Sequence, residues 1–254
     1  MSAAIIIPAR FASTRLPGKM LLSETGKPLL QHSWEQAMKV RNAARVLIAT
    51  DDQRIADAAK AFGGQAVMTA SHHATGSNRI AEAAATISES IIVNLQGDEP
   101  DIDPVQVEKL IDHQAKSTAA ASTLACSFPP GAKTGSGSPA DPNCVKVALT
   151  PLSGSEAYRA LYFSRAPIPG GNSSTAPNFL HIGVYAYSRD SLIDFANADR
   201  TDLEKAENLE QLRILERGGS IDVLLTQNAN PGIDTRADYD AFVARIKATG
   251  HSTI

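Results

Sequence analysis

The chain has 254 residues, of which 43% are hydrophobic and 20% are charged, as in a globular protein with one large α/β domain or two small ones. A formal net charge of −3, with no run of Lys and Arg, argues against a general nucleic-acid binder. No stretch approaches the ~18 apolar residues of a transmembrane helix, so no membrane partner is expected.

Short apolar runs alternate with segments of helical periodicity in the first half of the chain. Short β-branched runs bounded by turn residues predict buried strands, and apolar residues spaced three or four apart predict helices. The predicted strands are Ala3–Ile7, Arg45–Ala49 and Ile91–Leu95, and the predicted helices are Pro28–Val40, Asp52–Phe62 and Arg79–Ile87. This alternation predicts a mostly parallel sheet with helices on both faces.

Acidic residues stand before two of the predicted helices. Asp103 precedes Pro104 and the helix Val105–Gln114, which is the pattern of an N-cap followed by proline at the first helical position. Asp51 precedes the helix Asp52–Phe62 with similar spacing, so we expect capping there as well.

The pattern changes after a further predicted strand, Ala119–Ala125. The next predicted strands have no long helix between them, which favours antiparallel pairing; they are Cys144–Thr150, Ala157–Phe163 and Leu180–Tyr187. Two Gly/Ser-rich loops, Phe128–Asn143 and Pro169–Pro177, interrupt this region.

The last part of the chain returns to helices. Thr201 and Glu204 have capping-box spacing and predict a helix that runs to about Arg217, where Gly218-Gly219 can end it. A strand at Ser220–Gln227 and a helix at Thr235–Lys247 follow, and the residues after Thr249 are expected to fray. We predict a single domain over 1–254, in which a smaller, partly antiparallel lobe spans about 120–218.

Three cations lie on the loop that leaves the first predicted strand. Arg10, Arg15 and Lys19 follow that strand at the edge where open α/β sheets bind ligands. Arginine forks and a lysine point charge suit a triphosphate. The loop is neither a Walker A loop nor a GxGxxG fingerprint, which disfavours generic NTPases and dinucleotide binding. The alternative is a solvated basic loop.

Two carboxylates could reach the same edge of the sheet. Asp98 follows the strand Ile91–Leu95, and a carboxylate there can hold Mg²⁺ together with phosphate oxygens and water. Asp234 follows the strand Ser220–Gln227 across a turn. From the residues alone, Asp234 could equally be an N-cap of the last helix.

The opening block and several later blocks resemble one known family. Ile6-Ile7-Pro8-Ala9-Arg10-Phe11-Ala12-Ser13-Thr14-Arg15-Leu16-Pro17-Gly18-Lys19 resembles the signature of the 3-deoxy-manno-octulosonate (Kdo) cytidylyltransferases. The later matching blocks, in order, are Gly76–Arg79, Val93–Pro100, Ala160–Arg165, His181–Tyr185, Leu209–Arg213 and Gly232–Thr235. The blocks are collinear and span nearly the whole chain.

The resemblance implies a Rossmann-like, GT-A-like nucleotidyltransferase fold and a magnesium-dependent enzyme. That enzyme would join CMP from CTP to Kdo, release pyrophosphate for lipopolysaccharide biosynthesis, and be a cytoplasmic homodimer. The resemblance implies that Asp98 and Asp234 are the metal ligands and, with Arg10 and Lys19, the catalytic residues. The implied nucleotide contacts are Pro8, Ala9, Arg10, Arg15, Lys19, Ser77 and Arg79. The implied sugar contacts are Gln96, Arg165, His181, Tyr185, Glu210 and Gln211, with Arg165 facing the sugar carboxylate.

The expected mechanism is an in-line attack of the anomeric hydroxyl of the sugar acid on the α-phosphorus of CTP. The basic loop would neutralise the triphosphate and the leaving pyrophosphate, so catalysis is mostly positioning and electrostatics. No histidine is a convincing general base. Magnesium near Asp98 and Asp234 would acidify the hydroxyl and make a separate base unnecessary.

The sequence departs from the family pattern in the predicted cytosine and ribose loop, Thr69–Arg79. Ser77 stands where the family usually has Thr, and Asn78 stands where it commonly has Asp or Glu. We expect the amide oxygen of Asn78 to accept a hydrogen bond from Arg79, without the charge of a carboxylate.

Three other functions remain open at this point. The same chemistry could act on an 8-amino analogue of Kdo or on a sialic acid. A GT-A glycosyltransferase would need an acidic metal motif, which Asp101-Ile102-Asp103 superficially supplies. A nucleotide-binding module without turnover is the non-enzymatic alternative.

The remaining metal-binding residue types point to no further site. Cys126 and Cys144 lack zinc-site spacing, and a reduced chain is the expected state. His72-His73 has no third ligand in the sequence around it, so we expect a solvated pair.

Overall fold

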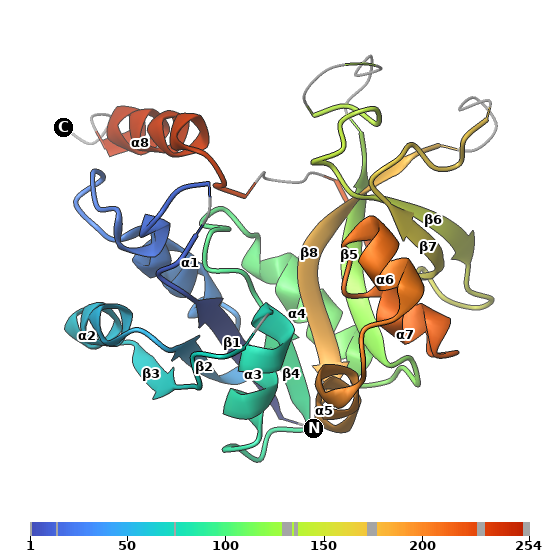
Figure 1. The fold of residues 1–254 in the computed structure, drawn as a ribbon, viewed down its shortest axis with the longest axis horizontal. Helices are drawn as coiled ribbons and strands as arrows, with labels where there is room; N and C mark the ends of the chain where they lie inside the picture. Colours follow the sequence, from blue (N-terminus) through green and yellow to red (C-terminus); the bar gives the residue numbers. More distant parts are fainter. Residues whose placement is uncertain are drawn as a thin grey trace. The chain divides into compact units, whose positions relative to one another are not determined.

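The computed structural model describes residues 2–13, 15–73, 75–128, 134, 137–171, 177–227 and 232–250. These residues form two compact units (Figure 1). The N-terminal unit combines 2–108 with 230–254, and the central unit is 109–229.

The N-terminal unit contains a parallel sheet in the strand order β3-β2-β1-β4 (Figure 1). The strands are β1 (Ala3–Ala9), β2 (Ala43–Thr50), β3 (Gln65–Met68) and β4 (Ile91–Asn94). The helices that connect them are α1 (Leu29–Ala37), α2 (Gln53–Ala61) and α3 (Gly76–Ala84), with a short 3₁₀ helix, η1 (Lys19–Leu21), before α1. Every residue of β1 is buried, as expected for a strand covered on both faces.

Two helices lie near the points where the chain leaves and re-enters the N-terminal unit. Helix α4 (Pro104–Gln114) contains the boundary between the units, and Asp103 caps it by accepting a hydrogen bond from the Val105 N–H at 2.9 Å. Helix α8 (Arg236–Gly250) packs through a core cluster with the start of α1. The buried members of that cluster are Leu29, Ile233, Tyr239, Phe242 and Val243.

The central unit is mainly antiparallel, as predicted. Its strands are β5 (Ala121–Ser127), β6 (Lys146–Pro151), β7 (Tyr158–Ser164), β8 (Phe179–Ser188) and β9 (Ile221–Thr226). Strand β5 pairs antiparallel with β8 and parallel with β9, while β7 pairs antiparallel with β9 and β6. The first residues of β6 also pair with β8. Helices α5 (Arg189–Asn197), α6 (Asp202–Glu207) and α7 (Leu212–Glu216) complete the unit. The predicted α/β class is confirmed.

Two helix beginnings differ from the prediction. Asp52, not Asp51, caps α2 by accepting the Arg54 N–H at 2.9 Å, while Asp51 forms an ion pair with Arg79 at 3.2 Å. Helix α3 begins at Gly76 because Thr75 is its N-cap, so the predicted loop Thr69–Arg79 ends in a helical turn.

The predicted helix from Thr201 to about Arg217 is two helices. Asn208 adopts φ 54° at the end of α6, and α7 begins four residues later. Thr201 stands at the N-cap, but its side chain makes no capping bond. The Glu204 carboxylate, which would complete the capping box, is buried and paired with Arg213 instead. Glu210 and Gln211 therefore lie on the turn between the helices and not on one continuous helical face.

Other features follow from the described residues. Strand β3 and helix α5 were not predicted. Parts of the two predicted Gly/Ser-rich loops, 129–133, 135–136 and 172–176, lie outside the described residues, and so do residues 251–254. Cys126 and Cys144 form no disulfide. No helix in the described part of the chain has the length and apolar character that crossing a membrane would require.

Candidate active site

The basic loop leaves the carboxyl end of β1 and folds back on Phe11. The N–H groups of Ser13 and Gly18 both donate to the Phe11 carbonyl at 3.0 Å, and the Arg54 guanidinium stacks 3.4 Å above the Phe11 ring. Gly18 has φ +69°, and a Cβ there would lie 3.1 Å from the Phe11 ring. Glycine is therefore required to turn the chain into η1, which begins with Lys19.

Lys19 joins three segments that are distant in the sequence. Its ammonium donates to Asp98 Oδ2 at 2.5 Å, to the Ile233 carbonyl at 2.9 Å and to Asp234 Oδ1 at 3.1 Å. The Ile233 N–H donates to the Asp98 carbonyl at 2.9 Å, which ties the two carboxylate segments together. Only 8% of the Lys19 side chain is exposed, so this ammonium is the internal counter-ion of both aspartates.

Asp234 is available for this cluster because its neighbours cap α8. The Thr235 N–H donates to Asp238 Oδ2 at 2.8 Å, and the Asp238 N–H donates back to the Thr235 hydroxyl at 3.2 Å. This is a capping box, so the alternative role of Asp234 as the N-cap is wrong. Arg15 adds a second cation to Asp234 at 2.9 Å.

The other predicted nucleotide contacts lie around the end of β1. Pro8 and Ala9 are buried in β1, and Arg10 is exposed directly after it. A Cβ on Gly76 would lie 3.5 Å from Pro8 Cγ, so the start of α3 packs on this strand end. Ser77 is buried in the first turn of α3.

Arg79 and Asn78 differ from the expectation. The Arg79 guanidinium is buried and donates to Thr69 Oγ1 at 2.5 Å, and its carboxylate partner is Asp51. The amide oxygen of Asn78 accepts a hydrogen bond from the Thr75 hydroxyl at 2.7 Å, so it serves the cap of α3. Asn78 therefore stabilises the start of α3, while Asp51 and Thr69 orient the Arg79 guanidinium.

The two aspartates fit a magnesium site. Both carboxylates lie within hydrogen-bonding distance of one nitrogen, at the sheet edge where the basic loop also begins. Mg²⁺ takes one or two protein carboxylates and completes its shell with phosphate oxygens and water. No group of three His, Cys, Asp or Glu side chains suited to a metal occurs among the described residues, so substrate oxygens and water would have to complete the shell.

The acidic motif of the glycosyltransferase alternative is used elsewhere. Asp101 pairs with Arg245, and Asp103 caps α4. Neither carboxylate lies in a metal cluster of the described residues, so this structure gives no support to that alternative.

Glu99 was not predicted as a site residue. Burial, and then the charges of Asp98 and Asp234, raise the pKa of Glu99 to about 8. Its Cγ lies 3.8 Å from the position of a Cβ on Gly232, so it belongs to the same cluster. In the sequence, only the position of Glu99 directly after Asp98 indicated that it could belong to this cluster.

The central unit holds Arg165 on the turn after β7. The Arg165 Nε donates to the Glu207 carbonyl at 3.2 Å, and Nη1 donates to the Pro142 carbonyl at 2.9 Å. The Glu207 carboxylate accepts the Arg165 N–H at 3.0 Å and the Ser164 hydroxyl at 2.7 Å. Glu207, to which the family resemblance gave no role, therefore orients Arg165.

The remaining predicted sugar contacts of the central unit gather on β8 and the turn between α6 and α7. His181 Nε2 lies 3.1 Å from Thr123 Oγ1, and burial lowers the pKa of His181 to about 3, so the ring is neutral. Gln211 is buried at the N-cap of α7. The hydroxyl of Tyr185 and Oε2 of Glu210 are buried without a hydrogen-bond partner among the described residues.

Gln96 lies in the N-terminal unit, unlike the other predicted sugar contacts. Its amide donates to Asn94 Oδ1 at 3.0 Å, at the end of β4. The described residues thus place Gln96 with the carboxylate cluster and the other five in the central unit.

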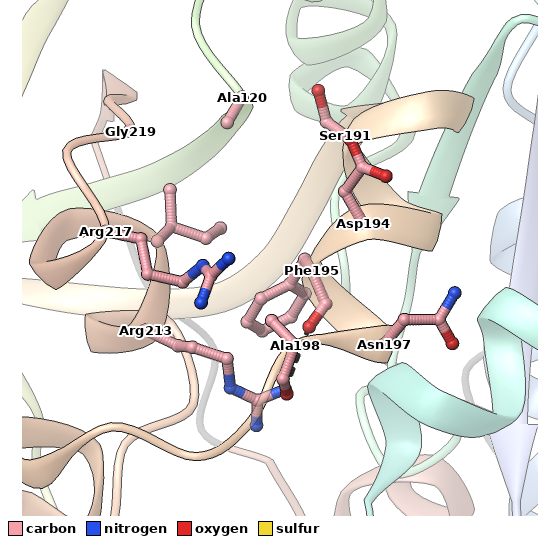
Figure 2. Close-up of a pocket in the computed structure, with 10 residues that line it drawn as sticks. Ala120, Ser191, Asp194, Phe195, Asn197, Ala198, Arg213, Arg217 and Gly219 are labelled. Atoms are coloured by element: carbon pink, nitrogen blue, oxygen red, sulfur yellow. Dashed lines mark hydrogen bonds between the residues drawn. The ribbon is translucent and has the colours of Figure 1, made fainter.

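A cavity of about 480 Å³ in the central unit contains none of the predicted site residues. It lies between α5 and α7, and Figure 2 shows the Arg213 guanidinium turned toward Phe195 and Ala198 at its wall. Arg213 is occupied by donating to the carbonyls of these two residues at 2.9 and 3.2 Å.

The comparisons with known proteins cover nearly the whole chain. The model of the cytidylyltransferase family matches residues 4–221. The 3-deoxy-manno-octulosonate cytidylyltransferase of Geotalea daltonii is 42% identical over 98% of this chain and 100% of its own length. The chain belongs to the cytidylyltransferase family. The family predicted from the sequence blocks is therefore confirmed, and the chain is a nucleotidyltransferase.

A second relative and two solved structures are similar to this chain in sequence, in fold or in both. The 3-deoxy-manno-octulosonate cytidylyltransferase of Escherichia coli is 40% identical over 92% of both chains. The solved structure of CMP:2-keto-3-deoxy-manno-octonic acid synthetase complexed with CTP has a TM-score of 0.89 and 38% identity, over 98% of this chain and all of its own. A nucleotidyl transferase from Methanothermobacter thermautotroptrophicus shares the fold at a TM-score of 0.61 and 12% identity.

Proposed function

We propose that this chain is a magnesium-dependent Kdo cytidylyltransferase, which transfers CMP from CTP to Kdo and releases pyrophosphate for lipopolysaccharide biosynthesis. The observation that carries the proposal is the full-length similarity to a synthetase of this class solved with CTP. The carboxylate cluster at the carboxyl end of the parallel sheet is consistent with it.

In the proposed mechanism, the anomeric hydroxyl of Kdo attacks the α-phosphorus of CTP and pyrophosphate leaves. Asp98 and Asp234 would hold Mg²⁺, and the ion pairs with Lys19 orient these carboxylates. When bound, Mg²⁺ would neutralise phosphate charge and lower the pKa of the attacking hydroxyl. Arg10 and Arg15 would stabilise the charge of the triphosphate and of the leaving group.

The sugar acid would bind to the central unit. Arg165, already oriented by two carbonyls, would face the sugar carboxylate. Tyr185 and Glu210 have buried oxygen atoms without partners in the described chain, and hydroxyls of the sugar would supply hydrogen bonds to them. His181, neutral and next to Thr123, would contact a hydroxyl and not act as a cation.

Pyrophosphate release tests the proposal directly. Each of the four NTPs is assayed with Kdo, its 8-amino analogue and N-acetylneuraminate, with and without Mg²⁺. We expect turnover with CTP, Kdo and Mg²⁺, and its near-complete loss in Asp98→Asn. Asp101→Asn is the control, because Asp101 pairs with Arg245 outside the cluster, and it should keep most of the activity. Faster turnover of another sugar acid than of Kdo would contradict the substrate assignment.

The assembly and the location remain predictions. We expect a homodimer, as the family resemblance implies, in the cytoplasm. The net charge and the apolar pattern of the sequence predict no nucleic-acid or membrane partner. Light scattering at micromolar concentration and fractionation of the native cells measure the mass of the assembly and the compartment.

A further inference from the structure

Lys146, the first residue of β6, is a buried cation whose ammonium donates to three backbone carbonyls. Its side chain is 0% exposed. The ammonium donates to the carbonyls of Asp141 at 2.9 Å and Cys144 at 2.6 Å, and also to the carbonyl of Arg165. An ammonium has three N–H donors, so each has one acceptor.

These acceptors come from two separate parts of the central unit. Asp141 and Cys144 lie in the turn before β6, while Arg165 lies in the turn after β7. Burial lowers the pKa of Lys146, which marks a charge held inside the protein at a cost. Three hydrogen bonds to carbonyls offset part of that cost and connect the turn before β6 to the turn after β7.

Glu207, the last residue of α6, also binds the turn that contains Arg165. The carboxylate of Glu207 accepts the Arg165 N–H and the Ser164 hydroxyl, while its carbonyl accepts the Arg165 Nε. The Arg165 Nη1 donates to Pro142, which lies in the same turn that Lys146 binds. Lys146 thus fixes both the backbone of Arg165 and the segment that orients its guanidinium.

We infer that Lys146, with Glu207, is a positioning residue that sets the Arg165 guanidinium in place for the carboxylate of the sugar acid. This inference rests on the proposed function, because it takes Arg165 as the sugar-carboxylate contact. It assigns to Lys146 no contact with either substrate. Loss of its three donors would leave Arg165 present but misplaced, which weakens the sugar acid and spares CTP.

The test is a double-mutant cycle between Lys146→Met and Arg165→Ala, read as KM for Kdo and KM for CTP in steady-state pyrophosphate assays. We expect Lys146→Met to raise the KM for Kdo by about tenfold, as for a lost charge-assisted contact, with less than a twofold change for CTP. In the Arg165→Ala background, Lys146→Met should change the KM for Kdo by less than about twofold, because the contact it serves is already gone.

Gln114→Met is the matched control for lost stability. Gln114 is buried in the same unit, donates to the Ala119 carbonyl at 3.0 Å and accepts the Ser122 hydroxyl, far in sequence from the Arg165 turn. It should lower Tm as Lys146→Met does and leave both KM values unchanged. An equal rise in the KM for Kdo in Gln114→Met would overturn the inference.

Two further outcomes also decide the matter. If Lys146→Met raises the KM for Kdo equally with and without Arg165, the positioning role is wrong. If Lys146→Met does not fold, Glu207→Ala must show the same selective, Arg165-dependent rise, and its absence overturns the inference. Failure of the proposed function is a separate result, since wild type would then not turn over Kdo; the cycle is then measured with the sugar acid that wild type uses.

Discussion

The buried ion pair between Arg213 and Glu204 should dominate the stability of the α6–α7 region. The two side chains are 3% and 1% exposed. Arg213 Nε and Nη2 each donate to a Glu204 oxygen at 2.7 Å, and Nη1 donates to the Phe195 and Ala198 carbonyls (Figure 2). Arg213→Met removes all of these donors and keeps an apolar chain of similar reach.

The expected loss follows from what stays behind. Removing one partner of a buried pair costs about 3–5 kcal/mol, because the other charge stays buried and unpaired. Arg200 also donates to Glu204, at 3.0 Å, but it is 51% exposed and can compensate only in part. We therefore expect Arg213→Met to lower the free energy of unfolding by about 3 kcal/mol, at the lower end of that range.

Urea unfolding followed by circular dichroism measures this loss through the midpoint and the slope. Arg200→Ala is the control and should cost at most about 1 kcal/mol, as an exposed pair does. The double variant Glu204→Met/Arg213→Met removes the orphaned charge and should be more stable than Arg213→Met alone. A loss below about 1 kcal/mol in Arg213→Met, or no recovery in the double variant, refutes the reasoning.

Two more predictions concern protonation and capping. Burial lowers the pKa of His181 to about 3, whereas the unfolded chain protonates it below about pH 6.5; its contribution to stability is complete above that pH and is lost as pH falls toward 3. His181→Asn should therefore reduce the drop in Tm between about pH 7 and pH 5, with the exposed His72→Asn as control, and an unchanged drop would contradict this. Asn78→Asp should stabilise the protein by about 0.3–1 kcal/mol, because an anion in the first turn of α3 favours the helix dipole and can still accept from Thr75. A severalfold change in the KM for CTP without a rise in Tm would instead assign Asn78 to the nucleotide.

The first half of the fold could be predicted because its sequence pattern is local. Strands such as Ala3–Ala9 and Ile91–Asn94 are continuous apolar runs, and both are buried along their whole length. The edge strand Gln65–Met68 was missed because its residues are mostly exposed and it carries no such run. Strands that are buried on both faces were therefore predicted from their continuous apolar runs, whereas an exposed edge strand was missed.

The errors in the central unit have a long-range cause. The capping-box spacing of Thr201 and Glu204 predicts one helix, but Glu204 bonds Arg213 across the break at Asn208. A buried bidentate ion pair outweighs a single capping bond of about 1 kcal/mol. Spacing within one segment cannot reveal this competition, because the winning partner lies beyond the turn.

The sequence predicted that several candidate residues lie close together, but it did not predict the contacts among them. Asp98 and Asp234 were both expected near Lys19, and the structure brings all three together. The ammonium of Lys19 bonds to both carboxylates and to the Ile233 carbonyl, and its predicted contact with the triphosphate stays a prediction. The internal partner was not predictable from spacing, since 79 and 215 residues separate Lys19 from the two aspartates.

The candidate residues of the two units differ in whether their polar atoms have hydrogen-bond partners within the described chain. In the N-terminal unit, Lys19 neutralises both aspartates before any ligand arrives. In the central unit, the Tyr185 hydroxyl and Glu210 Oε2 are buried without partners in the described chain. Thr201 Oγ1 of the same unit is also buried without a partner in the described chain. Each such group costs about 1–3 kcal/mol until a hydrogen-bond partner reaches it. Under the proposed function, hydroxyls of the sugar acid would supply hydrogen bonds to Tyr185 and Glu210, while an apolar ligand of the same size would leave both groups unpaired.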